Sequence, residues 1–123
     1  MGKSFFGRAI FAFCVIFVPY YVKIKQRRYN AAWCSPTTRL ASDHFTKIKE
    51  YLKTAVELFN ELHIDTPILT KEDNKNITDN SEMIQFDRET ANGVVPYSAC
   101  YQLSLNNKSI NAGYTLHLIV VDR

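Results

Sequence analysis

Residues 35–62 read SPTTRLASDHFTKIKEYLKTAVELFNEL, and this stretch decides the expected fold. Its apolar residues recur at alternating spacings of four and three, which is the period of one face of a helix. They are Ala41, Phe45, Ile48, Leu52, Ala55, Phe59 and Leu62. The sequence therefore predicts a long amphipathic helix, with Ser35 as its N-cap and Pro36 at its first position, ending near His63.

Three later segments alternate between apolar and polar residues, which is typical of half-buried strands. They are residues 83–89, 95–105 and 114–120, and residues 106–109 (NNKS) form the expected hairpin turn between the last two. A sheet and a helix with one apolar face each bury those faces best against one another. The expected fold class is α+β, with the long amphipathic helix packed on a small three-stranded antiparallel meander.

The segment before residue 25 is almost wholly apolar. Residues 9–22 carry no charge but span only about 21 Å as a helix, whereas residues 5–24 approach the roughly 30 Å of a bilayer core. We expect an N-terminal transmembrane helix whose Arg8 and Lys23 extend to the interfaces. Its anchor residues are Phe5, Ile10, Phe13, Ile16, Phe17 and Val18. A cleaved signal peptide and a buried core helix are the two alternatives.

Charge divides the 123-residue chain into two parts. Fifteen Lys and Arg against twelve Asp and Glu give a net charge of +3. Residues 1–32 hold six basic residues and no acid (+6), so residues 33–123 hold nine basic and twelve acidic residues (−3). This asymmetry predicts a membrane anchor with a basic flank (1–32) and a small soluble domain (33–123), and argues against nucleic-acid binding.

The three cysteines indicate whether the protein lies in an oxidising or a reducing compartment. Cys14 lies within the apolar segment, so Cys34 and Cys100 are the candidate disulfide. Closing that loop would stabilise a small domain by about 4 kcal/mol. Two free thiols in a reducing compartment are the alternative. The positive-inside rule places the domain weakly in the cytoplasm, while a disulfide favours the outside, and we expect an extracytoplasmic domain on a single-pass membrane protein.

No catalytic motif or metal-binding motif is present. His44, His63 and His117 are scattered, and no pair of them has the spacing of metal ligands. We therefore expect no enzymatic activity, catalytic residue, metal, cofactor or small-molecule substrate. A concave pocket that gathered one of these histidines with a carboxylate would revive the enzyme class.

One stretch resembles a known family. Pro19, followed ten residues later by Tyr29-Asn30-Ala31-Ala32, is similar to the segment of type IV pilins and pseudopilins where the hydrophobic helix leaves the membrane. The resemblance implies a small antiparallel sheet, often pinned by a disulfide, and assembly through protein contacts. The leader junction and the early Glu of these families are absent.

These observations together predict a non-enzymatic, membrane-anchored cell-envelope protein. It is expected to act through protein–protein contacts, as a pilin-like or secretion-assembly component that includes self-assembly among its contacts. Its partners would be the membrane and other proteins. The alternatives are a membrane-tethered inhibitor or immunity-type binding protein, and an accessory subunit of a membrane complex.

Overall fold

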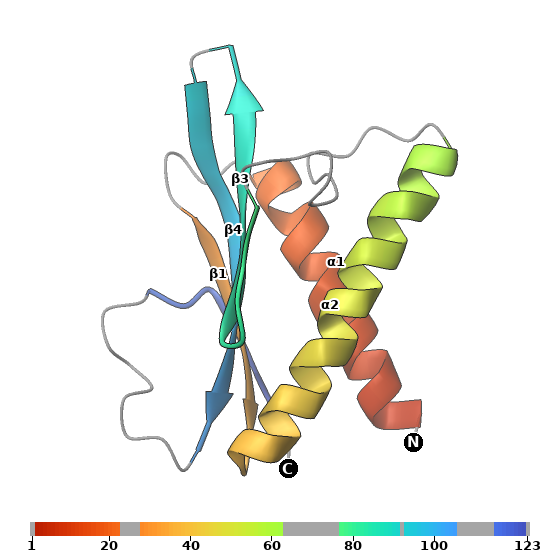
Figure 1. The fold of residues 1–123 in the computed structure, drawn as a ribbon, viewed down its shortest axis with the longest axis vertical. Helices are drawn as coiled ribbons and strands as arrows, with labels where there is room; N and C mark the ends of the chain where they lie inside the picture. The colour runs from red at the N-terminus through yellow and green to blue at the C-terminus, as the bar shows by residue number, and fades with distance from the viewer. Residues whose placement is uncertain (1, 23–27, 63–76, 92, 106–114, 123) are drawn as a thin grey trace.

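A computed structural model of the chain describes residues 2–22, 28–62, 77–91, 93–105 and 115–122 (Figure 1). These residues form two helices and five strands. In chain order the elements are α1 (Gly2–Val22), β1 (Tyr29–Ser35), α2 (Thr38–Glu61), β2 (Ile77–Asp79), β3 (Met83–Thr90), β4 (Gly93–Ser104) and β5 (Leu118–Val121).

The strands form one mixed sheet with the order β2-β3-β4-β1-β5. The first strand in the sequence lies inside the sheet, where β1 pairs in parallel with both β4 and β5. Ala31 of β1 is in register with Cys100 on one side and with Leu118 on the other. The pairs β2–β3 and β3–β4 are antiparallel, so the sheet combines both arrangements.

The predicted three-stranded meander is therefore wrong, although the chain is α+β. The segment expected to follow β4 as the third strand forms β5 over Leu118–Val121 and pairs with β1. The reason is β1, whose residues were predicted to be a basic flank and a helix N-cap and not a strand. Six of its seven residues are buried. A strand buried on both faces shows no alternation of polar and apolar residues, and the alanines of β1 have little strand propensity.

Both helices lie on one side of the sheet, where α1 and α2 cross each other and each contacts β1 and β4 (Figure 1). The predicted amphipathic helix is present as α2, and its buried stripe of Ala41, Phe45, Ile48 and Leu52 faces the core. The N-cap differs from the expected one. The backbone N–H of Leu40 donates to Oγ1 of Thr37 at 3.2 Å, while Ser35 ends β1.

The first helix belongs to the same core. Phe11, Val15 and Ile16 of α1 are at most 1% exposed, and the Phe11 ring meets the Trp33 ring edge-on at 5.7 Å. Gly7 also lies beside this ring: a Cβ at position 7 would be 3.5 Å from Trp33, which is an ordinary van der Waals contact. The Tyr97 hydroxyl also donates a hydrogen bond to the carbonyl of Ile16.

The predicted transmembrane helix is a second correction. Within the described ranges, no helix is both long enough and apolar enough to cross a membrane, so the single-pass membrane localisation is also wrong. Of the apolar residues that were assigned to lipid, Ile16 lies in the core and Phe17 and Val18 pack against it, whereas Phe5, Ile10 and Phe13 are exposed. The expected hairpin turn at 106–109, His63 and the basic residues Lys23, Lys25 and Arg27 lie outside the described residues.

Candidate functional site

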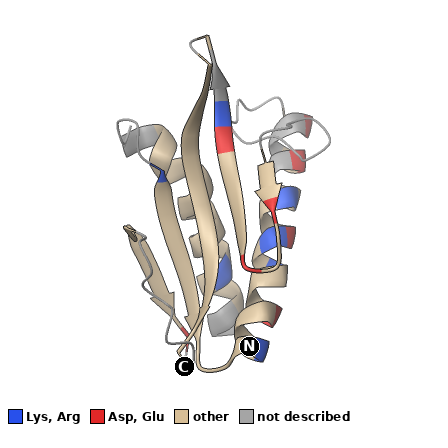
Figure 2. Cartoon of the chain, turned by 60° about the vertical axis from the view of Figure 1, so that its left-hand side comes forward, with Lys and Arg blue, Asp and Glu red and all other residues tan. Residues whose placement is uncertain are grey.

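The outward side of α1 carries exposed apolar side chains. Phe6, Ile10 and Phe13 are 65%, 51% and 58% exposed, and their spacing of four and three places them on one face of the helix. We call these three residues the outer ridge. Figure 2 shows that charged residues gather along α2 while α1 is almost uncharged. A helix that is apolar on all sides is normally covered on all sides.

A groove runs beside the outer ridge, between α1 and α2. Its volume is about 490 Å³. It is lined by Ala9, Ala12, Phe13, Ile16 and Phe17 of α1 and by Glu50, Tyr51, Thr54 and Ala55 of α2. Three of the lining residues, Ala9, Ala12 and Ala55, have small side chains, which fill less of this space than larger ones would. We call the outer ridge and this groove together the docking face.

The predicted anchor residues divide between exposed positions and the core. Phe5, Ile10 and Phe13 are exposed, and the Phe5 ring lies 5.7 Å from that of Tyr51 on α2. Ile16 is buried, while Phe17 and Val18 are half-buried against the core. These residues were predicted from the sequence to form an apolar surface, but Phe6 was not predicted to belong to it. The four-and-three spacing of Phe6, Ile10 and Phe13 was the signal that could have found the outer ridge.

A polar chain of side chains joins α1, α2 and the end of β5. Nη1 of Arg8 lies 2.9 Å from Nδ1 of His44, and Nε2 of His44 lies 2.7 Å from Oδ2 of Asp122. A guanidinium only donates, so Nδ1 must accept and Nε2 must carry the hydrogen that is donated to Asp122. The His44 ring also lies 5.2 Å from that of Trp33. These two polar contacts fix the positions of α1 and α2 relative to the end of β5.

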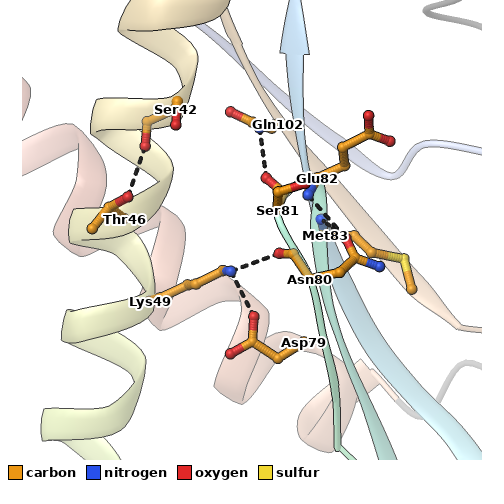
Figure 3. Close-up of polar contacts among 9 residues, drawn as sticks. All are labelled: Ser42, Thr46, Lys49, Asp79, Asn80, Ser81, Glu82, Met83 and Gln102. Carbon is orange, nitrogen blue, oxygen red and sulfur yellow. Dashed lines mark hydrogen bonds and ion pairs between the residues drawn. The ribbon is translucent and has the colours of Figure 1, made fainter.

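Polar contacts also tie α2 to the β2–β3 hairpin, as Figure 3 shows. Nζ of Lys49 lies 2.5 Å from Oδ1 of Asp79 and 2.7 Å from the carbonyl oxygen of Asn80. The same ammonium lies 4.9 Å from the centre of the Phe45 ring. Because Lys49 is held from three sides, these contacts are structural and leave the docking face as the candidate for function.

The predicted disulfide between Cys34 and Cys100 is not formed, and all three cysteines are free thiols. The physical reason is the sheet register. Cys100 is opposite Ala31, and Cys34 is three residues further along β1, so the two side chains point to opposite faces of the sheet. Burial raises the pKa of both thiols, which keeps them protonated and unreactive.

The described residues form no metal centre, since no three of their His, Cys, Asp or Glu side chains come together. The Nδ1 of His117 accepts a hydrogen bond from the backbone N–H of Asn30 at 3.1 Å, and its ring stacks on Tyr29 at 5.5 Å. His44 is the histidine that the structure places beside a carboxylate. It does not line the groove, and its second nitrogen is taken by Arg8.

Comparison with known proteins adds no relative: no family model, curated protein or solved structure matches this chain. The resemblance of residues 19–32 to type IV pilins and pseudopilins stays a prediction. The docking face is thus described by its geometry alone.

Proposed function

We propose that this protein acts by binding another protein surface through the docking face, as an assembly component and not as a catalyst. The observation that carries the proposal is the outer ridge. More than half of each of its three side chains is exposed on a helix whose opposite side fills the core. Contiguous exposed apolar surface of this kind marks interaction sites in folded proteins.

The chemistry of the docking face also supports protein contacts. Aromatic side chains beside a groove with an alanine floor supply the pocket-and-anchor arrangement that dominates binding energy at interfaces. Among the described residues that line the groove, Glu50 is the one with an acidic or basic side chain. Interface centres are similarly depleted in charge and rich in aromatic residues.

A photo-crosslinking experiment in the cells that make the protein tests this proposal. A photoreactive phenylalanine analogue replaces Phe13 in one version and Lys53, an exposed residue of α2 outside the groove lining, in a control version. We expect discrete protein adducts from position 13 that disappear when Ile10→Glu is added. Equal adducts from both positions, or none from position 13, would contradict the proposal.

A further inference from the structure

We infer that the partner of the docking face is a second copy of this chain, bound in a closed twofold dimer. This inference rests on the proposed function and names the occupant of the same surface. It starts from the position of Phe13, which is 58% exposed and also lines the groove. The projecting ring and the space that can receive a ring therefore lie side by side on one face.

This adjacency has a consequence for symmetry. In a twofold contact the same patch is used by both molecules, so each copy must offer a projection and a recess that match. Phe13 of one copy then enters the groove of its partner while the partner's Phe13 enters the first groove. Both contacts form in the same dimer and use the docking face of each copy. No docking face is left for a third copy, so the dimer does not extend into a filament.

The size of the surface is sufficient for a weak dimer. Phe5, Phe6, Ile10 and Phe13 are each more than half exposed. An aromatic side chain offers 150–250 Å², so these residues and the groove walls present about 500 Å² per copy. Two copies would bury about 1,000 Å², which is the lower end of specific interfaces. We therefore expect a dissociation constant in the micromolar range.

The charge distribution permits two such faces to meet. The chain carries +3 overall, so two copies repel one another weakly at long range. Among the described side chains of α1, the basic one is that of Arg8, which is buried and directed to His44. Phe6, Ile10 and Phe13 carry no charge, so the ridges themselves add no repulsion, and Glu50 in the groove lining is the acidic group that each copy brings to the contact.

Sedimentation equilibrium of the purified full-length chain over a wide concentration range tests the inference. We expect a monomer of 14.2 kDa at low concentration and twice this mass at high concentration. Phe13→Glu should weaken the dimer at least about 100-fold, because a twofold interface contains the substitution twice. Thr46→Glu introduces the same charge at an exposed position of α2 away from the groove lining and should leave the dimer unchanged.

A second variant separates a dimer from binding to lipid. Ala9 is exposed and lines the groove, so Ala9→Phe fills the recess while it adds apolar surface. Dimerisation should weaken at least about 10-fold, since a filled recess excludes Phe13. Vesicles of phosphatidylcholine and phosphatidylglycerol in equal parts should not bind either protein. Vesicle binding that increases with Ala9→Phe would overturn the inference in favour of a lipid surface.

The remaining outcomes are also decisive. A chain that is monomeric at every concentration, or a dimer that is insensitive to Phe13→Glu, overturns the inference. Ile10→Lys repeats the test at a second exposed ridge position if Phe13→Glu does not give a folded circular dichroism spectrum. If the chain is monomeric but position 13 still crosslinks to a different protein in cells, the proposed function stands and only the identity of the partner is wrong.

Discussion

The two helices pack on the same face of one sheet, yet their outer surfaces differ. The outward side of α2 is rich in charged residues, whereas that of α1 presents the apolar outer ridge. A helix that buries one stripe needs only one apolar face. Folding of the chain therefore does not explain the second apolar face of α1. This face is where contacts with another molecule are expected.

The largest effect should come from the inner face of α1. Phe11→Ala removes a fully buried ring that packs on Trp33, and we expect a loss of about 3–5 kcal/mol in the free energy of unfolding. Phe13→Ala on the outer ridge should cost less than about 1 kcal/mol at concentrations where the chain is monomeric. Urea denaturation measures both. Equal losses would show that α1 does not divide into a core face and an outer face.

The next largest effect should come from the hydrogen-bonded side chains of Arg8, His44 and Asp122. Arg8→Met keeps much of the side-chain length but leaves Nδ1 of His44 without its donor. We expect a loss of about 1–3 kcal/mol, because a buried polar atom then lacks a partner. Arg39→Met, at an exposed position of α2, is the matched control and should stay within about 0.5 kcal/mol. No difference between the two variants in urea denaturation would contradict the proposed geometry.

Alkaline pH should lower the stability of the folded chain. Burial raises the pKa of Cys100, Cys34 and Tyr97 above the ordinary values of these groups. Above about pH 8.5 the unfolded chain releases thiol protons that the folded chain retains, so the unfolded state binds fewer protons and stability falls as pH rises. Each retained proton contributes a slope of up to about 1.4 kcal/mol per pH unit.

The variant Cys100→Ala sharpens that test. It should reduce the alkaline slope of the unfolding free energy against pH by the contribution of about one proton. Cys14→Ala should reduce this slope less, because Cys14 lies partly exposed on α1. Urea midpoints measured in reductant between pH 8 and pH 11 give both slopes. A slope that Cys100→Ala leaves unchanged would mean that this thiol is accessible to solvent.

The smallest effect should be found on the outer side of α2. Lys53→Ala changes an exposed residue outside the groove lining, so we expect a change within about 0.5 kcal/mol in stability and no change in dimerisation. Urea denaturation and sedimentation equilibrium measure the two quantities. An effect as large as that of a ridge substitution would remove the distinction between the two helices.

The sequence predicted α2 well because its stripe is buried on one side and solvated on the other. It failed for β1, since burial on both faces and an alanine-rich sequence remove the strand signal from residues 29–35. It failed for the disulfide because the parallel pairing of β1 with β4 joins residues that are 69 positions apart, such as Ala31 and Cys100. Such a register follows from tertiary packing and leaves no local pattern.

The candidate site was predicted only in part. Phe5, Ile10 and Phe13 were recognised as a surface that must be covered, but the uniform apolarity of α1 was attributed to lipid. An apolar helix with no polar side has the same composition whether lipid or protein covers it. Phe11, Val15 and Ile16 lie in the core, which shows that protein covers this side of α1. That packing cannot be predicted without knowing that Trp33 on β1 lies beside Phe11.

The interior place of β1 in the sheet also has a consequence for synthesis. Ala31 is made long before its neighbour Leu118 in β5, because most of the described residues lie between them. The sheet cannot close until β5 has been made, so both apolar sides of α1 stay uncovered while the intervening residues are synthesised. Chains with such long-range pairings fold slowly and aggregate readily. A nascent copy of this protein would therefore depend on a chaperone to shield residues 2–22 until β5 has been made.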